Sequence, residues 1–82
     1  MHELGIAESI LDAVRKEAAA NSPARPVKVG VRIGALAGVD PDSLSFCFEA
    51  LVKDSDLAPL ALAIEPAPAD QLEFAWLELE ER

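Results

Sequence analysis

The first three residues of this chain, Met1, His2 and Glu3, have the types and spacing of a terminal metal chelate. A free α-amine followed directly by histidine can form consecutive chelate rings through the amine nitrogen, the deprotonated amide nitrogen of His2 and its imidazole. A fourth donor would come from Glu3 or from an approaching carboxylate such as Asp40. Nitrogen-rich, near-planar donor sets suit Ni(II) and Cu(II) rather than Mg(II) or Ca(II). The alternative is a surface histidine without a ligand, because first residues usually fray.

Other kinds of chemistry have little support in the sequence. His2 is the one histidine, and Cys47 is the one cysteine, so neither a Ser-His-Asp nor a Cys-His arrangement is available. Cys47 falls within an apolar helical stripe and is interpreted as a small core residue. A single thiol builds no disulfide framework and no cysteine-rich zinc site, and it fits a reducing cytosol. We therefore expect no enzyme activity and a cytoplasmic protein.

The charge balance limits the partners. The 82 residues include 15 acidic and 7 basic side chains, which gives a net charge of −8. Such a surface repels phosphate backbones, so nucleic-acid binding is not expected, whereas cations and basic protein patches are attracted. No apolar run approaches the roughly 20 residues that span a bilayer. The start lacks a secretory signal, so we expect the mature protein to begin at Met1.

The terminus must be positioned by the elements that follow it. Apolar residues at three- and four-residue spacing predict an amphipathic helix over residues 4–19. Strict alternation of valine and isoleucine predicts a half-buried strand over residues 27–34. A second helix should begin at Asp40 as N-cap, with Pro41 in its first turn, and end near Lys53.

The last third of the chain predicts two more strands. Leu60, Leu62 and Ile64 alternate with alanines, and a final strand covers residues 72–79. The apolar phase of this last strand slips after Trp76, which indicates either a bulge there or a partner on the second face. The predicted fold is one α+β domain over residues 1–82. It has the order helix, strand, helix, strand, strand, with both helices on one face of a three-stranded mixed sheet.

Three segments carry a resemblance to a known family. The opening Met1-His2-Glu3-Leu4, which continues into Ile10-Leu11-Asp12-Ala13-Val14, closely resembles the HypA/HybF family of hydrogenase nickel metallochaperones. Val29-Gly30-Val31-Arg32-Ile33-Gly34-Ala35-Leu36 is similar to the strand and loop of that family, and Asp40-Pro41-Asp42-Ser43-Leu44-Ser45-Phe46-Cys47-Phe48-Glu49 to its second helix. The resemblance covers roughly the first 65 residues, and the closing strand resembles the C-terminal strand of the family.

The resemblance implies a function. The family delivers Ni(II) to the precursor of a [NiFe]-hydrogenase large subunit, beside a HypB-type GTPase, and some members serve urease maturation. Its nickel site maps onto Met1, His2 and Glu3, and an acidic residue that assists in some members maps onto Asp40. For Asp40, capping alone is the competing interpretation, because an N-cap carboxylate stabilises a helix by about 1 kcal/mol.

One departure from the family concerns zinc. Members carry two Cys-x-x-Cys pairs between the last two strands, whereas residues 65–71 of this chain contain no cysteine. We expect no zinc and a simple hairpin of the last two strands. A natural zinc-less relative and an engineered deletion both remain open. The alternative function is a protein-interaction module of the same fold that no longer handles metal, in which an exposed edge strand pairs with a partner or with a second copy as a homodimer.

Overall fold

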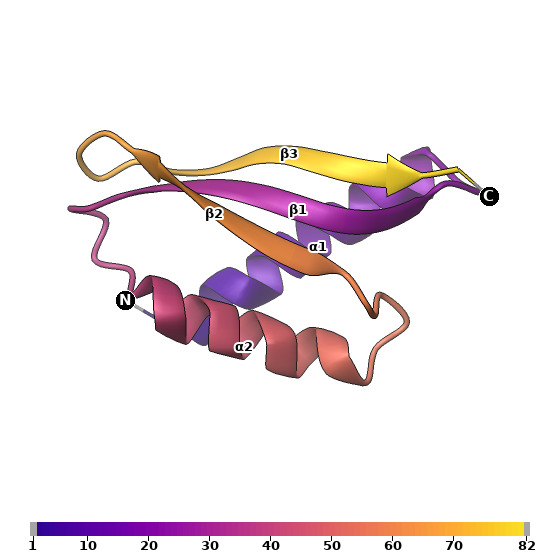
Figure 1. Ribbon diagram of the computed structural model, residues 1–82, viewed down its shortest axis with the longest axis horizontal. Helices are drawn as coiled ribbons and strands as arrows, with labels where there is room; N and C mark the ends of the chain where they lie inside the picture. The colour runs from indigo at the N-terminus through magenta and orange to yellow at the C-terminus, as the bar shows by residue number, and fades with distance from the viewer. Residues whose placement is uncertain (1, 82) are drawn as a thin grey trace.

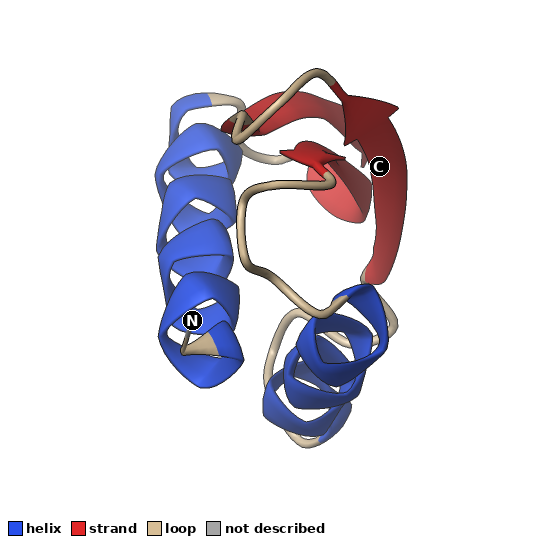
Figure 2. Ribbon diagram, turned by 90° about the vertical axis from the view of Figure 1, so that its left-hand side faces the viewer, coloured by secondary structure: helices blue, strands red, loops and turns tan. Residues whose placement is uncertain are grey.

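The two helices and three strands follow one another along the chain in the expected order. A computed structural model describes residues 2–81 and contains α1 (Glu3–Ala20), β1 (Arg25–Gly34), α2 (Pro41–Lys53), β2 (Ala61–Ala67) and β3 (Leu72–Glu80). Both helices lie on one side of the sheet (Figures 1 and 2). The predicted α+β class and the predicted order of elements are therefore confirmed.

The sheet has the order β2-β1-β3, so the first strand in the chain is the central one. β2 pairs with β1 in parallel, and β3 pairs with β1 in the antiparallel direction. The predicted hairpin of the last two strands is wrong, because β1 lies between them. The short connection between β2 and β3 suggested a hairpin, but it crosses over the end of β1.

The crossing is made by residues 68–71, next to Gly34 at the end of β1. The Gly34 N–H donates to the Gln71 carbonyl at 2.7 Å. A Cβ atom at position 34 would lie 2.1 Å from the Ala69 carbonyl oxygen, so the crossing requires glycine there. The predicted connection over residues 65–71 is shortened at its start, because β2 continues through Pro66 to Ala67. Proline is tolerated there because β2 is an edge strand.

The core lies between the helices and the helix-facing side of β1. Val29, Val31 and Ile33 alternate along β1, as the sequence pattern predicted, and all three are buried. Phe48 of α2 is the largest fully buried side chain. Cys47 is half-buried and packs against this cluster, which confirms its assignment to the core. The other buried apolar residues are Ala7, Ile10, Leu11, Val14, Leu44, Val52, Leu57 and Leu60.

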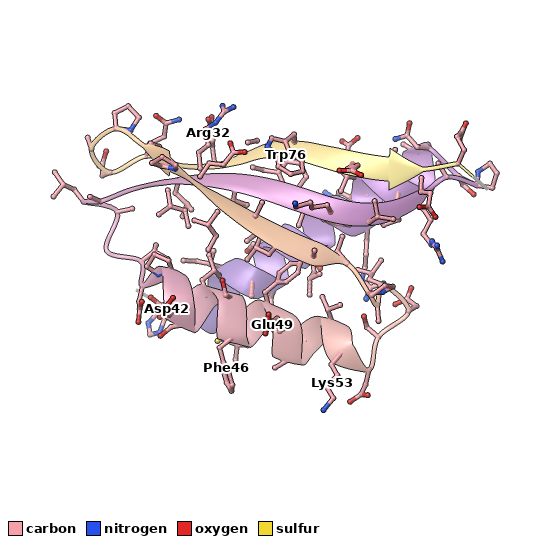
Figure 3. All side chains as sticks on the ribbon, in the orientation of Figure 1. Arg32, Asp42, Phe46, Glu49, Lys53 and Trp76 are labelled. Atoms are coloured by element: carbon pink, nitrogen blue, oxygen red, sulfur yellow. The ribbon has the colours of Figure 1, made fainter. Side chains whose placement is uncertain are left out.

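The phase slip in the last strand is a β-bulge at Ala75. Gly30 is opposite Trp76, but Val31 is opposite Phe74, which leaves Ala75 as the extra residue. Because of this bulge, Phe74 and Trp76 lie on opposite faces of the sheet although they are two residues apart. Phe74, which is opposite the buried Val31, lies on the helix side of the sheet. Trp76, which is opposite Gly30, lies on the open face and is labelled in Figure 3.

Trp76 spans the open face of the sheet. Its indole lies over Gly30, where a Cβ atom would meet the ring at 2.1 Å. The indole N–H donates to Glu65 Oε2 of β2 at 2.9 Å. Nearby, Arg32 of β1 is ion-paired with Glu65 at 3.4 Å and with Glu73 of β3 at 3.1 Å. The open face thus connects all three strands through polar contacts around one aromatic ring.

Candidate metal centre

His2 immediately precedes α1, at the N-cap position. Its backbone is extended, with φ −91° and ψ 91°, and its carbonyl accepts the Ile6 N–H at 3.1 Å. The imidazole makes no capping hydrogen bond to the helix and is exposed. Met1, whose amine the sequence proposed as the anchor of the chelate, lies outside the described residues. The described part of the predicted site therefore begins with an accessible imidazole at a helix terminus.

Glu3 is the first residue of α1, and it ties this terminus to the second helix. Its Oε2 atom accepts the backbone N–H of Asp40 at 3.0 Å. This hydrogen bond holds the pKa of Glu3 below its usual value, because it favours the ionised carboxylate. No local pattern of residues could have predicted this contact, because it joins residues 37 positions apart. Its effect is to hold the end of the chain that carries His2 beside the start of α2.

Asp40 is the N-cap of α2, as predicted. Its Oδ1 atom accepts the Asp42 N–H at 3.2 Å, and its Oδ2 atom accepts the Ser43 hydroxyl at 2.8 Å. Pro41 follows in the first turn. Both carboxylate oxygens are thus engaged in stabilising the helix, which supports the capping role. A role for Asp40 as a metal ligand stays a prediction.

The structure brings three of the four predicted site residues to one end of the molecule, through the hydrogen bond between Glu3 and Asp40. Within residues 2–81 it contains no group of three His, Cys, Asp or Glu side chains placed to hold a metal ion. The described side chains alone therefore do not form a preassembled cage. A chelate at this end would need backbone and amine nitrogens in addition to the imidazole, which is the donor set that the sequence suggested.

Sequence reasoning missed a groove that begins beside His2. It runs between α1 and β3 and has apolar walls. Its helical wall includes Gly5, Ser9 and Ala13, and their regular four-residue spacing is the signal that could have indicated it. None of the helices in residues 2–81 combines the length and the apolar character that crossing a bilayer requires.

Comparisons with known proteins agree with this fold and place the start of α1 within a matched region. A family model described as "Hydrogenase/urease nickel incorporation, metallochaperone, hypA" matches residues 1–73. The hydrogenase maturation factor HypA of Solidesulfovibrio magneticus is 43% identical over 68 residues, which are 83% of this chain and 58% of that protein. The HypA of Desulfatibacillum aliphaticivorans is 44% identical over 70 residues, which are 83% of this chain and 53% of that protein.

A solved structure shows the same fold. The solution structure of the Ni metallochaperone HypA from Helicobacter pylori superposes with a TM-score of 0.73 at 24% identity, over 82% of this chain and 58% of that one. The chain thus spans little more than half the length of the relatives that it matches.

Proposed function

The chain belongs to the HypA family of hydrogenase/urease nickel-incorporation metallochaperones, and on that premise we propose that it binds Ni(II) at the start of α1. The observation that carries this proposal is the placement of His2. Its imidazole stands at a helix terminus, exposed and without a capping hydrogen bond, while the adjacent Glu3 anchors that terminus to Asp40. An available nitrogen donor next to a fixed helix end is the arrangement that a terminal chelate requires.

The proposed donors come mainly from the backbone. The amine of Met1, the amide nitrogen of His2 and its imidazole would provide three nitrogens in succession, a set that Ni(II) and Cu(II) prefer. Glu3 would provide the fourth donor or orient the others, and Asp40 would cap α2 with or without a metal contact. Copper should bind more tightly than nickel at such a site, so selectivity would come from the supply of metal and from partners.

The proposed role is carriage rather than catalysis. We propose that the chain delivers nickel in the cytoplasm to the precursor of a [NiFe]-hydrogenase large subunit, together with a HypB-type GTPase. The names of its relatives, hydrogenase maturation factors, support this direction. A site with an open, solvent-facing ligand suits transfer, because a metal held by few protein groups can pass to a second protein by ligand exchange.

Calorimetric titration with Ni(II) tests the site directly. The protein with a free Met1 amine is expected to bind about one ion per chain, and His2→Ala is expected to lower the affinity about 100-fold or more, because the imidazole is the principal side-chain donor. A Gly-Ser extension before Met1 should have a comparable effect, since it removes the amine from the chelate.

Two controls isolate the terminus. The same Gly-Ser extension placed after Arg82 should leave nickel binding unchanged. Cys47→Ser should also leave it unchanged, because Cys47, the one cysteine of the chain, is not part of the proposed site. If His2→Ala bound nickel as tightly as the parent protein, the carrier function would be refuted. The interaction module without metal, which the sequence left as the alternative, would then be the better account.

A further inference from the structure

A groove of about 430 Å³ separates α1 from β3 on the helix side of the sheet. Its floor is Val31 of the central strand, which is 1% exposed. The groove has room because three of the α1 residues that line it are small and lie at four-residue spacing along one face of the helix, beside the larger Ile6 and Ile10. The residues that form its walls include Gly5, Ser9 and Ala13 of α1, and Leu72 and Phe74 of β3.

The wall that β3 contributes is apolar and open to solvent. Leu72 and Phe74 are opposite Ile33 and Val31 in the sheet, so they lie on the side that holds the core. They are nevertheless 42% and 38% exposed. Burying two such side chains against a partner is worth about 1 to 2 kcal/mol each. The groove therefore has the apolar character of a binding surface.

The groove lies beside an open sheet edge. Because the strand order is β2-β1-β3, the side of β3 away from β1 has no neighbouring strand within residues 2–81. An edge of this kind offers backbone N–H and C=O groups to an added strand. Strand addition would place alternate side chains of the added segment on the two faces of the sheet. The side chains on the helix side would lie over the groove.

The charges on β3 define the chemistry of the added segment. Glu73, Glu78 and Glu80 lie opposite basic residues of β1, and β3 itself contains no lysine or arginine. Two of these pairs are ion pairs, Arg32 with Glu73 at 3.1 Å and Arg25 with Glu80 at 3.0 Å. A strand on the outer edge of β3 would meet the same row of carboxylates. Cross-strand pairing favours lysine or arginine at those positions.

We propose that the groove and the outer edge of β3 bind an extended segment of another protein in which apolar residues alternate with lysine or arginine. The apolar side chains would enter the groove, and the basic side chains would lie beside the glutamates. A second copy of this chain fits poorly, because pairing two β3 edges would bring acidic strands together in molecules of net charge −8. His2 lies at the groove, so the bound segment would lie next to the proposed nickel ligand, a consequence that rests on the proposed function.

Fluorescence anisotropy with labelled peptides tests this surface. The probe is a fluorescein-labelled Lys-Val-Lys-Val-Thr-Val-Lys peptide, compared with a peptide of the same composition in which lysines and valines form separate blocks, and with a version that has glutamate in place of lysine. The alternating basic peptide is expected to bind at least about tenfold more tightly than either comparison peptide, since only it can add as a strand and satisfy both faces.

Variants of the protein locate the binding surface. Ser9→Leu fills the groove from an exposed helical position and should weaken binding of the alternating peptide about tenfold, with circular dichroism verifying the fold. Glu78→Gln should weaken binding about two- to fivefold, the range for an exposed charge pair. Glu49→Gln is the matched control, because it removes the same charge from the exposed surface of α2 (Figure 3) and should change nothing.

Three outcomes would overturn the proposal: equal binding of the block peptide, unchanged binding by Ser9→Leu, or equal effects of Glu78→Gln and Glu49→Gln. Sedimentation showing a dimer that Ser9→Leu dissociates would assign the groove to a second copy instead. The peptide measurements are made in EDTA without metal. Their failure would leave nickel binding untouched, and a failure of nickel binding would leave them valid.

Discussion

The two helices of this protein begin in the same backbone conformation but use their first side chains differently. His2 and Asp40 are both N-cap residues with extended backbones, with φ and ψ of −91° and 91° for His2 and −84° and 112° for Asp40. Asp40 accepts a hydrogen bond from the Asp42 N–H, whereas His2 caps nothing. Because histidine is not a favoured N-cap residue, α1 forgoes a stabilising contact at this position. The difference indicates that Asp40 stabilises the start of α2, whereas the imidazole of His2 at the start of α1 stays free of helix capping.

The sharpest test exchanges the roles by giving α1 a cap. His2→Ser supplies a hydroxyl that can accept a helix N–H, so the free energy of unfolding should rise by about 1 kcal/mol. The same change removes the imidazole, and nickel affinity should fall about 100-fold or more. Urea unfolding and calorimetry measure the two quantities. Retained nickel binding, or a loss of stability, would contradict the division of roles.

The complementary change removes the cap of α2. Asp40→Ala should lower the free energy of unfolding by about 1 kcal/mol, within a range of about 0.5 to 2, because the N–H of Asp42 loses its acceptor. Nickel affinity measured on the same protein should change less than about threefold if Asp40 only caps. A nickel loss as large as that of His2→Ala would instead make Asp40 a ligand.

Ser43, which hydrogen-bonds to the capping carboxylate of Asp40, should have a smaller effect on the free energy of unfolding. Ser43 donates its hydroxyl to Asp40 Oδ2 at 2.8 Å on an exposed surface. Ser43→Ala should therefore lower the free energy of unfolding by about 0.5 kcal/mol, the low end for a hydrogen bond. Chemical denaturation measures it, and Ser45→Ala at a neighbouring position of α2 is the control. A loss equal to that of Asp40→Ala would mean that the hydroxyl, rather than the cap, carries the stability.

The smallest expected effect concerns Glu3 and depends on pH. The hydrogen bond from the Asp40 N–H holds the pKa of Glu3 below its usual value of 4.5, so folding favours the charged carboxylate. The stability from this contact is fully present above that value and is lost as the pH falls through the lower pKa of the folded state. The parent protein should thus exceed Glu3→Gln in stability near neutral pH, and the gap should close on acidification. A gap that widens in acid would refute this assignment.

The local signals in the sequence were sufficient for the elements and for the chelate candidate. Asp40 and Pro41 marked the start of α2, and alternating valines marked β1, because caps and side-chain periodicity are properties of neighbouring residues. His2 was identified from its position beside the first residue, and the structure places it exposed at the helix terminus.

Contacts between segments that are distant in the chain could not be predicted from the sequence patterns. The order of the sheet was predicted wrongly because a short connection usually joins neighbouring strands, and only Gly30 and Gly34 hinted otherwise by leaving room for Trp76 and for the crossing loop. The hydrogen bond between Glu3 and Asp40 and the groove beside α1 depend on how the helices lie against the sheet. Periodicity along one segment carries no information about that placement.

The central position of β1 has a consequence for how the protein is made. β1 is synthesised before both strands that flank it, since β2 and β3 come from residues 61–80. On a translating ribosome β1 therefore has no hydrogen-bonding neighbour until those residues have emerged. The sheet must close late, through pairings of high sequence separation, which slow folding and lengthen the exposure of unpaired strands. The apolar strand β1 thus stays without its sheet partners during synthesis, and the sheet is complete only once β3 has been made.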